Sequence, residues 1–391
     1  MPMPIPMPSD PLAAVTHADP APYYRGLAAR RPFYRDEALG LWVAAGAAEV
    51  AAVLAHPASR VRPPAQPVPP GLAGSPAGAL FGGLIRMNDS AWNAPLKGVL
   101  LKRMAALELG GMRQRVSALA QGLPFDLTQP GAAVNHWMFS LPVLAVADAL
   151  GLAVAGQPGV AMQAAAQVTA FARAMSPLAT AQEIAAGSEA ATWLQAWMRE
   201  SLSVGAPASA PGRPLDALQR EALAAGVAKE VIATNAIGLL IQACEATAGL
   251  VGNMLVRLGR EMAQGRCPDE SGALRDVAAL VLREDPPVQN TRRFLATDAR
   301  LCGADLKAGD GVLLVLAAAS LDERMPGECA GKASRPWTFG AGRHACPGDA
   351  LAASVAQAVV AALLARGADP AALVRAFRYR PSLNTRIPHF L

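Results

Sequence analysis

A glycine-rich segment near the carboxyl end of the chain carries the residues whose types and spacing could do chemistry. Residues 339–348 read FGAGRHACPG, and the two glycines before Cys346 permit a tight turn. Pro347 is predicted to occupy the first turn of a following helix, where its missing N–H costs little. The amino end of that helix and the nearby N–H groups would stabilise a Cys346 thiolate. Such a thiolate is a good ligand for haem iron, and His344 could reach a haem carboxylate. A lone cysteine is more often structural, so the whole pattern carries this prediction.

A single acid interrupts the longest apolar helix that the sequence predicts. Residues 231–258 are apolar around most of the helix circumference, which is typical of a central, buried helix. Glu245 lies in the middle of this stretch. It could be a satisfied or partly solvated carboxylate, or a site residue, because a buried acid is costly unless it is paired. The bare sequence favours neither interpretation.

The elements that must position these two segments are mostly helical. Apolar residues recur at three- and four-residue spacing from about residue 92 to 200. The proline- and glycine-rich stretch 60–83 is predicted to be a long irregular loop. Further helices are predicted at 271–284 and 349–366, and short strands at 41–43, within 288–301 and within 311–317. The sequence therefore predicts a mainly α fold, with one domain over 1–391 and an irregular arm at 1–20.

Composition bounds the class of protein. Of 391 residues, 52% are hydrophobic and 17% are charged, which excludes a disordered or fibrous chain. The net charge of +5 is too small and too dispersed for a nucleic-acid surface. The five cysteines form no CxxC pair, so we expect neither a disulfide framework nor a zinc site. Alternating prolines at the start argue against a signal peptide or membrane anchor, and we expect a soluble, cytoplasmic protein.

The pattern at 339–348 resembles the haem-binding signature of the cytochrome P450 family, the haem-thiolate monooxygenases. The stretch 245–253 is similar to the family's central helix, and Arg283 with the following Glu-Asp-Pro-Pro resembles the end of the helix before its haem-anchoring strand. The resemblance implies a helical triangular prism with a small β-sheet region, and haem b as the cofactor. It assigns the iron to Cys346, with further haem contacts from Phe339, Gly340, His344 and Arg293.

Three departures from the family pattern concern the mechanism. The family usually follows the central acid with a threonine for proton delivery, whereas Ala246 follows Glu245 here, and the hydroxyl of Thr247 comes one position later. A helix turns about 100° per residue, so that hydroxyl points elsewhere. The family's Glu-x-x-Arg pair is incomplete, because Leu280 stands three residues before the arginine at 283. We expect this arginine to find another partner, such as a backbone carbonyl or the adjacent glutamate.

The third departure lies in the helix that normally offers a histidine and an arginine to the haem propionates. Trp92 stands roughly at the histidine position, and Lys97 is a candidate for the arginine position, although a solvated lysine is as good an interpretation. The candidate catalytic residues are Glu245 and Thr247. The resemblance implies substrate contacts from residues 60–85 and from the small or polar side chains Gln242, Ala243, Ala246 and Asn290.

The resemblance implies a monooxygenase that inserts oxygen from O2 into a small or medium-sized organic molecule, plausibly a secondary metabolite. Electrons would come from a separate ferredoxin and its reductase, docking on basic residues: Arg103, Lys332, Arg335 and Arg343. Solvated surface charge is an equal interpretation for each. Ala246 keeps open haem-thiolate chemistry without a dioxygen proton relay, namely peroxide-driven oxidation, oxidative coupling, dehydration or rearrangement. A haem-binding ligand sensor without turnover is the third possibility.

Overall fold

The computed structural model describes residues 6–152, 157–203, 212–265, 270–324 and 335–391. Helices make up 58% of it, which confirms the predicted mainly α fold class. The α-helices are α1 (Ala21–Arg30), α2 (Ala47–Ala55), α3 (Pro76–Gly83), α4 (Asn93–Ala105), α5 (Met112–Gln121), α6 (Pro130–Ala149), α7 (Pro158–Ala174), α8 (Ala181–Ser203), α9 (Pro214–Ala224), α10 (Lys229–Met262), α11 (Glu270–Glu284), α12 (Leu316–Ser320), α13 (Asp349–Ala365) and α14 (Pro370–Leu373).

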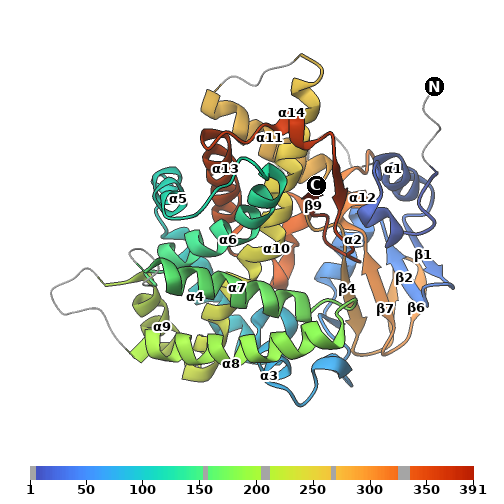
Figure 1. Cartoon of the computed structure of the whole chain (residues 1–391). Helices are drawn as coiled ribbons and strands as arrows, with labels where there is room; N and C mark the ends of the chain where they lie inside the picture. The colour runs from blue at the N-terminus through green and yellow to red at the C-terminus, as the bar shows by residue number, and fades with distance from the viewer. Residues whose placement is uncertain (1–5, 153–156, 204–211, 266–269, 325–334) are drawn as a thin grey trace.

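The strands form one small mixed sheet and two hairpins beside the helical body (Figure 1). The sheet has the order β1-β2-β7-β4-β3, and β4 pairs antiparallel with β7 so that Arg293 lies opposite Val312. This register fixes the arginine at the edge of the helical body. The strands are β1 (Phe33–Asp36), β2 (Leu41–Ala44), β3 (Ser59–Arg60), β4 (Thr291–Leu295), β5 (Ala299–Leu301), β6 (Ala304–Leu306), β7 (Gly311–Leu314), β8 (Phe377–Tyr379) and β9 (Pro388–Phe390).

Helix α10 runs through the centre of the helical body (Figure 1). Its observed bounds, Lys229–Met262, extend the predicted 231–258 by a few residues at each end. It is long and apolar enough to cross a membrane, but 83% of its most apolar window is buried inside the protein. This burial is that of a core helix, as its apolar circumference predicts.

The second half of the predicted loop 60–83 is wrong, because the chain there forms helix α3. The hydroxyl of Ser75 accepts a hydrogen bond of 3.1 Å from the N–H of Gly78 and caps the helix. Pro76 occupies the first helical position, where proline is favoured because no partner for its N–H is needed. Because the segment is rich in proline, its composition predicts a loop, although Ser75 followed by Pro76 is a signal for the start of a helix.

The arginine of the incomplete Glu-x-x-Arg pair is not buried. The side chain of Arg283 is 62% exposed, and its guanidinium forms an ion pair of 2.8 Å with Glu284. The adjacent glutamate was one of the partners expected. The burial that the family pattern implied for this arginine does not occur, so it needs no carboxylate from position 280.

A different ion pair, between Asp285 and Arg386, lies in the protein interior; Asp285 follows Arg283 by two residues. Arg386 is 1% exposed and its Nε donates to the Asp285 carboxylate at 2.6 Å. The same guanidinium donates to the carbonyl oxygens of Val15 and His17 and stacks on the Tyr379 ring at 3.5 Å. The nitrogens of this buried guanidinium thus have acceptors, and its face has a ring contact. It ties the chain's first twenty residues, the end of α11 and the final hairpin together.

Candidate active site

The cysteine loop is a tight turn stabilised by its own backbone. Gly340 and Gly342 both have a φ of 64°, in the left-handed region that favours glycine, as the pattern predicts. The N–H of Cys346 donates to the carbonyl oxygen of Phe339 at 2.8 Å and closes the loop. Phe339 ends a short 3-10 helix and packs against the main core. The loop therefore holds the cysteine in one defined place.

The Cys346 sulfur accepts one hydrogen bond, from the N–H of Gly348 at 3.4 Å. Burial raises the pKa of the Cys346 thiol, and the Gly348 N–H and the cations Arg335 and Lys97 only partly oppose it. The predicted placement of Pro347 is wrong by two residues, because α13 begins at Asp349 and the proline lies in the preceding turn. Burial thus outweighs the helix amino end, and a bound metal would be needed to deprotonate this thiol fully.

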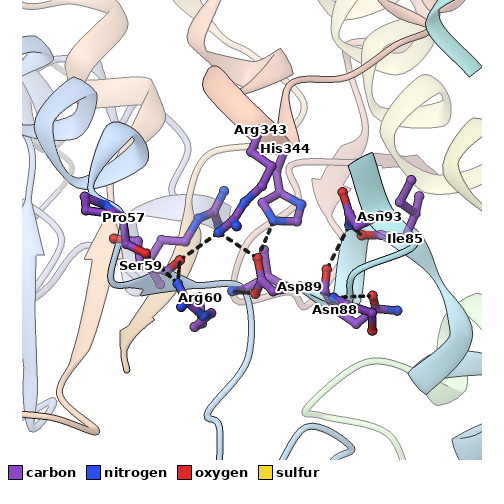
Figure 2. Close-up of polar contacts among 12 residues, drawn as sticks. Pro57, Ser59, Arg60, Ile85, Asn88, Asp89, Asn93, Arg343 and His344 are labelled. Atoms are coloured by element: carbon purple, nitrogen blue, oxygen red, sulfur yellow. Dashed lines mark hydrogen bonds and ion pairs between the residues drawn. The ribbon is translucent and has the colours of Figure 1, made fainter. Parts of the chain in front are cut away.

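His344 is already paired in this structure. Its Nε2 lies 2.8 Å from the Asp89 carboxylate, and the Arg343 guanidinium lies 2.9 Å from the same oxygen (Figure 2). The N–H of Val61 donates to the other Asp89 oxygen at 3.0 Å. Although burial acts to raise the pKa of Asp89, hydrogen bonds from His344 and Val61 and the charge of Arg343 hold it below its usual range. This carboxylate anchors the cysteine loop to the segment before α4.

Arg293 projects from β4 beside the same cluster and has no carboxylate partner among the residues that the structure describes. It is 7% exposed, and its guanidinium donates to the carbonyl oxygen of Arg292 at 2.8 Å. Burial lowers the pKa of Arg293 to about 10; Asp89 opposes this shift and Arg343 adds to it. At neutral pH the side chain remains a cation, so it retains capacity for an anion such as a propionate.

Of the two α4 candidates, one reaches the cysteine loop. Lys97 donates from Nζ to the carbonyl oxygen of Ala345, next to the cysteine. Trp92 is the residue before the first turn of α4 and packs on the main core, without a described hydrogen bond. Asn93, which sequence reasoning passed over, is 3% exposed and its Oδ1 is buried with no partner among the described residues. Its position at the start of α4, beside Asp89, is the signal that could have found it.

The face of α10 that carries the acid is incompletely packed. Gln242, Glu245 and Ala246 are only partly buried, whereas nearly all the residues around them on the helix are buried. Their spacing of three and four residues places them on one face of the helix. Thr247 is 2% exposed and lies off this face, as the rotation of 100° per residue predicts. The face therefore presents a carboxylate and an amide, with no hydroxyl from Thr247.

Glu245 has cations around it but no close partner. Burial raises the pKa of the Glu245 carboxyl, and the charges of Arg380, Arg86 and Arg173 partly oppose that rise. No hydrogen bond or ion pair to this carboxyl occurs among the described residues. An acid with a raised pKa and an unpaired carboxyl is suited to hold and release a proton.

The remaining predicted substrate residues differ in their freedom to act. Gln242 donates from Nε2 to the carbonyl oxygen of Gly238 on its own helix at 3.1 Å. Asn290 is 3% exposed and donates to the carbonyl oxygen of Leu383 at 2.8 Å, so its amide N–H holds the final loop. Ala243 is 8% exposed.

The basic residues expected to form a docking surface are mostly engaged within the chain. Arg103 lies 3.3 Å from Glu221, Arg335 lies 2.9 Å from Asp349, and Arg343 is paired with Asp89. Lys332 lies outside the described residues.

The residues present fit a haem. The cysteine loop offers one sulfur ligand, Cys346, on a backbone fixed by hydrogen bonds. Arg293 is a buried cation without an acidic hydrogen-bond partner, and Lys97 lies at the loop itself, as a dianionic macrocycle requires. The loop and the open face of α10 fit one class: a mainly α protein that would hold a haem through one cysteine, with an acid on the facing helix.

Comparisons with known proteins agree with this class. No family model matches the chain. It is similar to the biotin biosynthesis cytochrome P450 of Bacillus subtilis (29% identical; 40% of this chain, 42% of that protein) and to a cytochrome P450 of Mycobacterium marinum (36% identical; 33% and 34%). It thus spans less than half of these two relatives. The 20-oxo-5-O-mycaminosyltylactone 23-monooxygenase of Streptomyces fradiae is 25% identical, over 91% of this chain and 84% of that protein.

Solved structures show the same fold over nearly the whole chain. The structure of P450BioI in complex with an acyl carrier protein ligated to hexadec-9Z-enoic acid has a TM-score of 0.71 at 20% identity, covering 95% of this chain and 98% of that one. The haem domain of Tepidiphilus thermophilus P450 also has a TM-score of 0.71, at 18% identity and with 98% and 96% covered. The chain therefore has the fold of cytochrome P450 structures, and its curated relatives include proteins named cytochrome P450.

Proposed function

We propose that this protein is a haem-thiolate monooxygenase, a single haem-binding unit over residues 1–391 that inserts oxygen from O2 into a small or medium-sized organic substrate. The observation that carries the proposal is the cysteine loop, in which Cys346 is closed onto Phe339 and faces Lys97 and Arg335. Haem b with a thiolate ligand supplies O–O bond cleavage and oxidation of unactivated carbon. Relatives named as monooxygenases support the reaction class.

Cys346 would hold the iron, and the backbone of its loop keeps the sulfur in place. The Gly348 N–H donates to that sulfur and limits its basicity. Arg293 would neutralise one propionate directly. His344 contributes through its Asp89 ion pair, which fixes the loop, and its other ring nitrogen is left to face the cofactor.

Glu245 would move the protons. Its carboxyl is unpaired, its pKa is raised by burial, and it shares a helix face with Ala246 and Gln242. Because Ala246 has no hydroxyl, the proton passes from the Glu245 carboxyl through water or through a polar group of the substrate itself. Thr247 has no part in this route, since its side chain is buried off that face.

Electrons would come from a ferredoxin with its reductase. The basic residues first expected to dock it are largely paired with acids of this chain, and the neighbouring Lys102, although 65% exposed, is likewise paired with Glu221 at 3.2 Å. A secondary metabolite is a suitable substrate class, as the name of the Streptomyces fradiae relative indicates for that protein.

Ala246 also favours a second candidate, oxidation driven by peroxide, which brings its own protons and electrons. Isotope labelling separates the two. With a ferredoxin, its reductase, NADPH and 18O2, we expect 18O in products from a panel of fatty acids, terpenes and macrolides. Label derived only from H2 18O2, with none from 18O2, would establish the peroxide-driven reaction instead. Cys346→Ser, the control, should give no labelled product.

A further inference from the structure

Two asparagines fix the short segment that follows α3. Asn235 on α10 accepts from the Ile85 N–H at 2.7 Å and donates to the carbonyl oxygen of Gly83 at 3.0 Å. Asn93 donates to the carbonyl oxygens of Ile85 and Asn88, as Figure 2 shows. Buried amides that satisfy backbone groups on both sides of one residue make that residue's position rigid. The residue presented in this way is Arg86.

Arg86 is a partly buried cation whose Nε is fully buried and which has no acidic partner among the described residues. Its Nε is buried and makes no hydrogen bond to any described residue, and its NH2 has only a weak contact of 3.9 Å with the Met175 sulfur. The negative charges that act on it are Glu245 and Cys346, and neither forms an ion pair with it. An unsatisfied buried guanidinium costs several kcal/mol, so a protein retains one where a ligand supplies the anion.

Two groups act on Arg86, one on each side of the site: Glu245 on α10 and Cys346 on the cysteine loop. The charges of Asp89 and Arg343 act on Arg293, whereas neither of them acts on Arg86. Conversely, the charge of Arg86 acts on Glu245, and the charge of Arg293 does not. The Met175 contact places the Arg86 guanidinium beside the end of α7, with the α10 acid. The contact with Met175 and the charge of Glu245 place Arg86 toward the substrate side, with Cys346 as the one loop-side charge that acts on it.

We infer that the substrate carries an oxyanion group, a carboxylate or a phosphate, and that Arg86 binds it. This inference rests on the proposed function and names its substrate class. The planar guanidinium fork can donate two parallel hydrogen bonds to either group. Binding would pair the cation, and the rigid loop would set the distance between the anionic head and the carbon that is oxidised.

Equilibrium dialysis of the haem-loaded full chain tests this without any need for turnover. The probes are straight-chain acids from octanoate to hexadecanoate and phenylalkanoates, each with its methyl ester, and the alkyl phosphates with their alcohols. In the series that binds best we expect the anion to bind at least about tenfold more tightly than its neutral partner. Arg86→Met should weaken anion binding about a hundredfold and ester binding little. Arg86→Lys should restore part of the preference. If the carboxylic acids bind more tightly than the alkyl phosphates, the group is a carboxylate, and the reverse order identifies a phosphate.

The matched control is Arg380→Met, which removes a half-buried arginine that acts on Glu245 from the other side. It should keep the preference for anions. The substrate-free Arg86→Met protein should also unfold at a higher temperature than the natural chain, because an unpaired buried charge is removed.

Three results would overturn the inference: neutral partners that bind as well as anions throughout the panel, a preference that survives Arg86→Met, or a preference that is lost only in Arg380→Met. Loss of haem in Arg86→Met with unchanged selectivity would make Arg86 a propionate ligand and would equally overturn it. The proposed function fails separately, by the spectrum of the carbon monoxide complex. Thiolate-ligated protein that prefers esters refutes only the substrate class.

Discussion

The two sides of the site, the cysteine-loop side and the α10 side, differ in whether their charged groups form ion pairs. On the loop side, Asp89 accepts from His344, Arg343 and a backbone N–H, and among the described residues Arg293 and Lys97 donate to carbonyl oxygens. On the α10 side, Glu245 and Arg86 are buried near each other without an ion pair. Paired charges fix a scaffold, whereas unpaired ones remain available to a ligand or a proton. The comparison separates the residues that hold the site from those that act in it.

The largest effect is expected at the most completely paired charge. Arg386→Met should destabilise the protein by about 3–5 kcal/mol, because it leaves the Asp285 carboxylate and three carbonyl oxygens without their donor. Denaturant unfolding measures this change. The control is Arg283→Met, an arginine 62% exposed, which should cost less than about 1 kcal/mol. Equal losses of unfolding free energy in the two variants would mean that the arginine of the Glu-x-x-Arg position stabilises the fold as much as Arg386 does.

On the unpaired side, Glu245→Gln should lower turnover about a hundredfold, because a general acid is lost. Its effect on stability has the opposite sign. Burial raises the pKa of Glu245, so its contribution to stability is present below the ordinary value of about 4.3 and is lost as pH rises through the folded-state pKa. The glutamine variant should therefore be the more stable protein at neutral pH, with a difference that vanishes in acid. A variant less stable at pH 7 would show that Glu245 has a strong partner.

A smaller loss is expected from Asp89→Asn, about 1–2 kcal/mol, since the carboxylate is partly accessible. Hydrogen bonds hold the pKa of Asp89 below its usual range, so its stabilisation is present above about 3.9 and is lost as pH falls through the folded-state value. The stability of the variant should thus approach that of the natural chain as the pH falls below 4. Haem retention should weaken in parallel as the cysteine loop loosens.

Ala246→Thr should have the smallest effect, within about threefold on native turnover, because the substrate or water already completes the proton path. The oxidation of poor substrates should improve, with less peroxide released per NADPH consumed. A large gain with the native substrate would show instead that the missing hydroxyl limits the natural reaction.

Local patterns predicted much of this site, and tertiary partners explain what they missed. The turn at Gly340 and Gly342 and the limits of α10 follow from glycine conformation and helical periodicity, which neighbouring residues decide. Arg283 is exposed, and the buried ion pair nearby is formed instead by Asp285 with Arg386, which lies in the final hairpin about a hundred residues away. No local rule contains that contact.

Arg86 illustrates the same limit. In the sequence it is one basic residue after the apolar run GGLI, three residues past the segment expected to be loop. Only the asparagines of α4 and α10 show that the segment is rigid, and only the position of Glu245 shows what the cation faces. A buried cation becomes recognisable when its missing partner can be checked in three dimensions.

The central claim, that Cys346 ligates haem iron as a thiolate, is tested most directly by the absorption spectrum of the reduced, carbon monoxide-bound protein. The structure predicts a Soret band at the red-shifted, thiolate-type position, because the loop holds the sulfur with the Gly348 N–H and nearby cations. A band at the shorter wavelength typical of neutral thiol or histidine ligation would contradict it. That result would favour a ligand sensor or a non-oxygenase haem protein instead.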